Sequence, residues 1–284
     1  MKRFSILALA AGMLLSLPMQ AQNEDKNLFN HLSVGLTVGS TGWGLDVAAP
    51  IGNYVQTRVG FTLLPNFKYK TNVHVSGLVP AEVINQYGQT YNIPTDKVKV
   101  EGKTNVGDFK FLIDVYPFKR SSFHLTTGFY IGSSKVVKAY NKEDGVLLGV
   151  NAANKDIATY NAELAAGVLP AGAPGPFDPI GLKMGDYIFT PNSQGNVNAY
   201  IKTAGFKPYL GLGFGRAVPK KRVSVMFDAG VQFWGTPKVY LSNDDGDRRL
   251  EKKHVEGNDG GFFKTMSKIT VYPVLSLRIC GLIF

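Results

Sequence analysis

Ionisable side chains occupy alternate positions within strongly apolar segments of this chain, where they could form a buried network of ion pairs. An uncompensated charge in an apolar interior is costly, whereas a paired one is tolerated. Three of these side chains are basic and three are acidic, which favours pairing among them. The predicted network consists of Asp46, Arg58, Lys110, Asp114, Asp228 and Arg278.

One pair within this network is predicted from height along neighbouring strands. Asp228 lies six residues after Arg222, where a turn ends. Arg278 lies six residues before Phe284, the last residue of the chain. Equal heights on adjacent antiparallel strands therefore predict an ion pair between Asp228 and Arg278.

Other patterns that could support chemistry are weak. The four histidines are scattered without metal-ligand spacing, and no serine or acidic residue is in step with His124. The glycine-rich residues 211–215 lie within a strand pattern and lack the Gly-Lys-Ser/Thr of a phosphate loop. Residues 243–247 resemble half a calcium loop, but Lys252 stands where the ligating glutamate belongs. No catalytic residue, cofactor or metal site is predicted, and the chain is not expected to be an enzyme.

The segments that carry these charges have the two-residue period of strands. In the last segment, apolar residues at 275, 277, 279 and 283 alternate with Ser276, Arg278 and Cys280, and the chain ends on Phe284. A strand with one apolar and one polar face is typical of a barrel that faces lipid outside and a polar lumen inside. A terminal Phe284 also resembles the signal that outer-membrane proteins present to the barrel assembly machinery, which is an expected partner.

The amino-terminal end indicates export. Lys2 and Arg3 precede an apolar run over residues 4–17, and Ala21 suits the position before a cleavage site. The run is too short to cross a bilayer as a helix, which takes about 20 residues. We predict a signal peptide at 1–21, a barrel domain at 22–284, and location in the cell outer membrane. Cys280 is the only cysteine, which excludes an intramolecular disulfide.

Eight strands are predicted, with short turns after the second, fourth and sixth, and long loops after the third, fifth and seventh. This alternation is typical of bacterial barrels whose turns face the periplasm. The fold class is therefore all-β: an eight-stranded antiparallel up-and-down transmembrane β-barrel with long extracellular loops, at about 70–104, 139–204 and 242–262. Helices are expected within the loops at 80–87 and 151–166. The strands are expected at 31–39, 43–51, 54–69, 105–118, 123–138, 205–218, 223–241 and 263–284.

Four stretches resemble a group of small, mostly uncharacterised outer-membrane barrels. They lie at 114–118 (Asp-Val-Tyr-Pro-Phe), 207–215, 227–241 and 272–279. The resemblance covers the chain from about the fourth strand onward. It implies an OmpA-like or OmpW-like eight-stranded architecture, and it implies no reaction.

Three functions remain open from sequence. The first is a structural and interaction barrel with a charge-plugged lumen, whose extracellular loops bind a protein or glycan ligand. The second is a narrow channel for small solutes. The third is a soluble, exported lipocalin-like barrel, in which the aliphatic side chains would point inward. The formal net charge of +10 favours contact with outer-membrane lipid and lipopolysaccharide over nucleic acid, since no nucleic-acid motif is present.

Overall fold

The computed structural model describes residues 29–95, 97–104, 106–118, 120–184, 187–244, 246–250 and 269–283. The predicted signal peptide at 1–21, most of the predicted 242–262 loop, and Phe284 lie outside these ranges.

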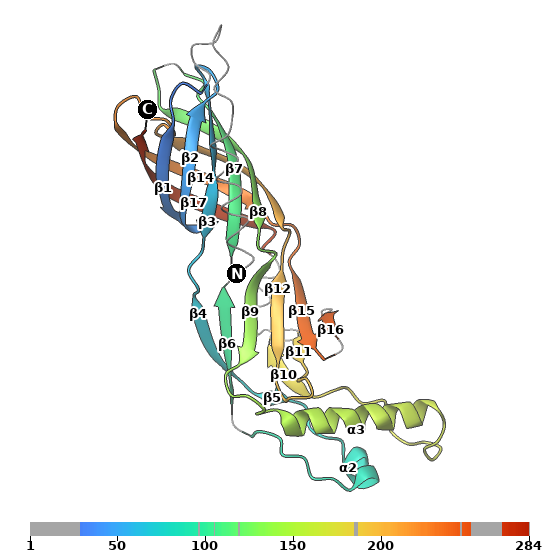
Figure 1. The fold of residues 1–284 in the computed structure, drawn as a ribbon. Coiled ribbons are helices and arrows are strands. Elements are labelled where there is room, and N and C mark those ends of the chain that lie inside the picture. Colours follow the sequence, from blue (N-terminus) through green and yellow to red (C-terminus); the bar gives the residue numbers. More distant parts are fainter. Residues whose placement is uncertain are drawn as a thin grey trace.

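Eight antiparallel strands close into a barrel, which confirms the predicted fold class (Figure 1). The order around the ring is β1-β17-β14-β13-β8-β7-β3-β2, and β1 pairs with β17 to close it. The strands are β1 Ser33–Gly39, β2 Gly42–Pro50, β3 Val55–Leu63, β7 Gly107–Val115, β8 Phe123–Gly132, β13 Phe206–Phe214, β14 Val223–Phe233 and β17 Val271–Leu282.

The period of two sorts the barrel side chains into an outer and an inner set. Leu36, Leu212 and Ile279 are 48%, 48% and 52% exposed, so the aliphatic positions point outward. The intervening charged positions are buried. This arrangement is the reverse of a lipocalin-like barrel, so the soluble interpretation of the sequence was wrong.

Five neighbouring barrel strands continue beyond one end of the barrel into a second sheet (Figure 1). This six-stranded sheet has the order β16-β15-β12-β9-β6-β4. Its strands β15, β12, β9, β6 and β4 follow the same lateral order as β14, β13, β8, β7 and β3, to which the chain joins them. The sheet comprises β4 Lys68–Val73, β6 Val98–Thr104, β9 Lys135–Asn141, β12 Asn198–Lys202, β15 Lys238–Asn243 and β16 Gly246–Arg249.

Two helices and a small sheet complete this extension, which we call the platform. The small sheet has the order β11-β10-β5, with β5 Val75–Ser76, β10 Gly181–Met184 and β11 Tyr187–Phe189. Helices α2 (Ala81–Tyr87) and α3 (Leu148–Ala165) confirm the two helices expected from sequence. Helix α3 begins three residues earlier than predicted. Ile157 and Tyr160 of α3 belong to one buried apolar cluster with Val137, Ala199 and Leu241 of the sheet.

The platform corrects the boundaries expected from sequence. The predicted strands 54–69, 123–138 and 223–241 are each divided in two, because Pro65, Ser133–Ser134 and Pro237 interrupt the ladders. The ranges 70–104 and 139–204, expected to be loops with one helix each, also contain strands of the platform. None of the described helices is long and apolar enough to cross a membrane.

Candidate functional site: the charged barrel interior

All six side chains of the predicted network lie inside the barrel and are at most 4% exposed. They come from five strands: Asp46 from β2, Arg58 from β3, Lys110 and Asp114 from β7, Asp228 from β14 and Arg278 from β17. Each stands at an inward position because its neighbours along the strand point outward. The interior therefore concentrates charge where water is scarce, and electrostatic interactions there are strong.

Arg58 joins two of the acids. Its Nη2 donates to Asp114 Oδ1 at 2.7 Å, and its Nη1 donates to Asp228 Oδ2 at 2.9 Å. Strands β3 and β14 are four places apart in the ring of eight, so they face each other across the lumen. The Arg58 to Asp228 pair therefore spans the barrel from wall to wall. Thr126 Oγ1 and His124 Nε2 add contacts to the two acids, at 2.7 Å from Asp114 and 2.9 Å from Asp228.

Asp46 is the second centre of the network. Lys110 Nζ lies 2.7 Å from its Oδ2, and Arg278 Nε donates to its Oδ1 at 2.6 Å. Thr37 Oγ1 donates to Oδ2 at 3.1 Å. One carboxylate thus binds two cations that belong to strands on either side of it.

Glycines on the intervening strands allow these contacts. Strand β1 lies between β17 and β2, and a side chain at Gly35 would collide with the Arg278 guanidinium. Strand β3 lies between β2 and β7, and its Gly60 is the register partner of both Asp46 and Lys110. At Gly213, register partner of both His124 and Asp228, a side chain would collide with the imidazole. Each long side chain therefore reaches across a strand that presents no side chain of its own.

The predicted Asp228 to Arg278 pair was wrong. In the register of β14 with β17, Asp228 stands opposite Ser276 and Arg278 stands opposite Met226. The two side chains diverge instead of meeting: Arg278 crosses Gly35 to Asp46, and Asp228 is held by Arg58 and His124.

Sequence reasoning missed two further parts of the interior. Lys207 Nζ lies 2.8 Å from both carboxylate oxygens of Asp108, and both residues are buried near the platform end of the barrel. At the opposite end, the connection from β13 to β14 folds inward. Ala217 accepts hydrogen bonds from Arg278 Nη1 at 2.8 Å and Ser33 Oγ at 2.6 Å, and Val218 N donates to Gln56 Oε1 at 2.9 Å. The alternation of the strands could have predicted that Lys207 and Asp108 point inward. The inward path of the β13–β14 connection has no comparable pattern in the sequence.

The interior holds one cluster with metal-ligand atoms among the described residues. Oxygens of Asp114 and Asp228 and a ring nitrogen of His124 lie within 4.8 Å of one another. Arg58 donates to both carboxylates, so its guanidinium takes the position that a cation would need. The guanidinium thus neutralises the charge of the two carboxylates.

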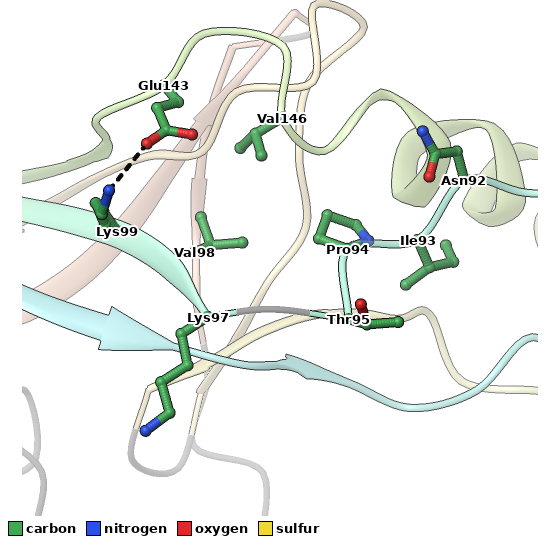
Figure 2. Close-up of a pocket in the computed structure, with 9 residues that line it drawn as sticks. All are labelled: Asn92, Ile93, Pro94, Thr95, Lys97, Val98, Lys99, Glu143 and Val146. Atoms are coloured by element: carbon green, nitrogen blue, oxygen red, sulfur yellow. Dashed lines mark hydrogen bonds and ion pairs between the residues drawn. The ribbon is translucent and has the colours of Figure 1, made fainter.

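The platform carries a pocket of about 310 Å³ (Figure 2). Val98 and Val146 line it beside Pro94, and Lys99 Nζ lies 3.4 Å from Glu143 Oε1 at its edge. Both partners of this ion pair are more than half exposed, so the pair is screened by water. The pocket presents no convergent set of buried polar groups among the residues that line it.

The distribution of apolar and charged side chains between the outside and the inside of the barrel decides its fold class. Its outer surface is a belt of exposed aliphatic and aromatic side chains, and its interior is charged and paired. A closed sheet satisfies every backbone group internally, as a bilayer requires, and the apolar belt suits the hydrocarbon region. The fold is that of an eight-stranded outer-membrane barrel.

No family model matches the chain, and no curated protein matches it. Several solved structures are similar at low identity. CarO2 of Acinetobacter baumannii has a TM-score of 0.42 at 14% identity, over 89% of this chain and 98% of that one. CarO of the same organism has a TM-score of 0.40 at 13% identity, over 90% and 99%. A major outer membrane protein of Thermus thermophilus has a TM-score of 0.31 at 14% identity, over 89% and 98%. These scores are too low to carry an argument, and the assignment of the fold rests on the closed barrel itself.

Proposed function

We propose that this protein is a structural and interaction barrel of the outer membrane, whose lumen is plugged by ion pairs and whose platform binds an extracellular partner. The observation that carries the proposal is the Arg58 to Asp228 contact, with Nη1 and Oδ2 2.9 Å apart across the full width of the ring. An eight-stranded barrel leaves room inside for side chains and little else. A side-chain pair that crosses the ring therefore divides the small space that remains.

Further layers support the same conclusion. Lys110 and Arg278 meet at Asp46, and Lys207 meets Asp108 nearer the platform. Residues 216–219, in the connection before β14, fold under the other end of the lumen, where Ala217 and Val218 are buried. The ordered platform at the opposite end gives the barrel a large surface for contact, which a purely structural anchor would not need.

Planar-bilayer recording tests the plug. The purified mature chain should give no stable unitary conductance. The double variant Arg58→Ala/Asp228→Ala removes both ends of the crossing pair and should open a small leak if the barrel still folds, which the heat-dependent shift of its gel mobility reports. The matched control is Lys135→Ala/Asp247→Ala, which removes a 3.3 Å ion pair of the platform and should remain silent.

The alternative function is a narrow channel for small solutes. Reproducible single-channel steps from the unmodified protein would overturn the plugged lumen and establish this alternative.

Export through a cleaved signal peptide at 1–21 is part of the proposal, and sequencing of the mature amino terminus tests it.

A further inference from the structure

Five lysines lie just beyond the barrel wall, one on each strand that continues into the platform. They are Lys68, Lys103, Lys135, Lys202 and Lys238. Each stands three to five residues from the end of its barrel strand: Lys135 follows Gly132 by three, and Lys68 follows Leu63 by five. At about 3.3 Å per residue, the backbone of each lysine lies about 10–17 Å beyond the end of its barrel strand, where the apolar belt ends.

The register places these lysines on one face of the six-stranded sheet. Lys68 is the partner of Lys103, and Lys103 is the partner of Lys138. Across β12, Lys202 is the partner of both Lys238 and Lys135. Two stacked rings lie on the same face: Tyr200 and Tyr240 have centroids 5.2 Å apart and planes 10° apart. Lys135 Nζ lies 3.8 Å above the Tyr200 ring, which joins the two groups of lysines into one surface. We call this surface the lysine face.

The lysine face continues the outer surface of the barrel. The opposite face of the sheet is apolar and belongs to the buried cluster of the platform, which includes Trp234. The Trp234 indole donates to Gln232 Oε1 inside the barrel at 2.9 Å. The apolar face therefore lies on the lumen side, and the lysine face lies on the side of the lipid-facing belt.

Positive charge on the lysine face exceeds negative charge. Glu101 lies 3.5 Å from Lys68, and Asp247 lies 3.3 Å from Lys135. Lys70, Lys103, Lys138, Lys202 and Lys238 make no ion pair with any residue in the described ranges. A cluster of lysine ammonium groups beyond the end of an apolar belt matches a layer of anions beyond the end of a hydrocarbon layer.

We propose that the lysine face binds the phosphate groups of the phosphorylated glycolipid in the outer leaflet, that is, of lipopolysaccharide. The lysine ammonium groups meet the phosphates beyond the level where the apolar belt ends, and the half-buried Tyr240 ring lies beside them for contact with sugar. The proposal deepens the interaction role proposed above, because it names the chemistry of one partner and depends on the barrel being in the outer membrane.

Binding of fluorescently labelled lipopolysaccharide to the folded, delipidated chain in detergent tests the proposal. The test variant changes Lys68, Lys103, Lys135, Lys202 and Lys238 to Gln. The control variant changes five basic residues away from this face to Gln: Lys155, Lys183, Lys220, Lys221 and Arg222. Both variants have the same net charge. The affinity of the test variant should fall by about tenfold or more, and that of the control variant should stay within about twofold. Dephosphorylated lipopolysaccharide should bind the unmodified chain as weakly as the test variant binds the intact glycolipid.

Three outcomes would overturn the proposal. Equal losses in the two variants would show a nonspecific effect of net charge. Equal binding of the dephosphorylated glycolipid would exclude phosphate recognition. A soluble acidic polysaccharide such as heparin that binds the face more tightly than lipopolysaccharide would identify a different partner. The conductance of the same preparation reports separately on the plugged lumen, so failure of one proposal is distinguishable from failure of the other.

Discussion

Asp228 and Arg58 connect opposite walls of the barrel, with Oδ2 and Nη1 2.9 Å apart and both side chains almost fully buried. Neighbouring strands are already joined by backbone hydrogen bonds, so an ion pair between neighbours adds little to the shape of the ring. A pair across the diameter ties two opposite walls directly to each other, whereas each backbone ladder joins only neighbouring strands.

A double-mutant cycle should locate this coupling. Arg58→Ala leaves two buried carboxylates, Asp114 and Asp228, without their shared guanidinium, and should lower the free energy of unfolding by about 3–5 kcal/mol. Combining it with Asp228→Ala should cost much less than the sum of the two single changes. The measurement is reversible urea unfolding in lipid vesicles. The cycle between Asp228 and Arg278 should be nearly additive, to within about 0.5 kcal/mol, and strong coupling there would contradict the observed pairing.

Gly35 should be intolerant of a side chain although its backbone is ordinary. Gly35→Ala places a methyl group against the Arg278 guanidinium, which Asp46 holds in place, and should destabilise the barrel by about 1–3 kcal/mol. Gly281→Ala is the control, since the nearest atom to its added Cβ is 3.9 Å away. Unfolding of both variants in urea gives the comparison. Equal effects would show that glycine matters here for strand flexibility instead of side-chain space.

The platform should loosen on acidification through Glu101. The pKa of Glu101 is lowered from its ordinary value of 4.5, first by the hydrogen bond from the Tyr140 hydroxyl at 2.8 Å and then by Lys68. A lowered pKa contributes stability that is present above the ordinary value and is lost as the pH falls through the folded value. Amide hydrogen exchange in β6 and β9 should therefore accelerate below pH 4.5. Tyr140→Phe should move this change to higher pH, and Glu101→Gln should abolish it. An unchanged profile in both variants would refute the assignment.

Two asparagines of α3 should hold the segment that follows the helix. Asn161 exchanges two hydrogen bonds of 2.8 Å with the backbone of Phe177, and Asn154 exchanges two of 2.8 Å with the backbone of Ile180. An aspartate has the same shape but cannot donate, so Asn154→Asp and Asn161→Asp should each cost about 1–3 kcal/mol of local stability. Limited proteolysis near these backbone positions should speed up accordingly. Asn151→Asp, one turn earlier, serves as the control, and a similar effect there would point to helix charge as the cause.

The inward and outward positions of the barrel could be predicted from sequence because strand side chains alternate strictly. That rule placed all six network members inside, including Arg58 and Asp114, which stand in otherwise apolar segments. Their partners could not be predicted in the same way. Pairing depends on the stagger of the closed ring and on how far a side chain reaches across a glycine, as Arg278 does over Gly35, and neither quantity has a local signal.

The platform could not be predicted from the sequence for a related reason. Its ladders join short segments that are distant in the chain, such as β4 with β6 and β12 with β15. A short run such as 98–100 alternates correctly, but three residues alone do not identify a strand partner. Pro65 and Pro237 mark the points where strands break, although both lie inside the longer strands, 54–69 and 223–241, that were expected from sequence. The two helices were predictable because their residues and terminators are local.

Because five strands run from the barrel wall into the platform, a pull on the platform acts on the barrel along the strand axes. Such a load strains many hydrogen bonds of a ladder at the same moment, whereas a load across the strands would break them one after another. The links at Pro65, Ser133–Ser134 and Pro237 are then the compliant points, and the barrel wall beneath them is stiff. A partner that pulls on the platform would therefore bend the platform at these links before the barrel itself was disturbed.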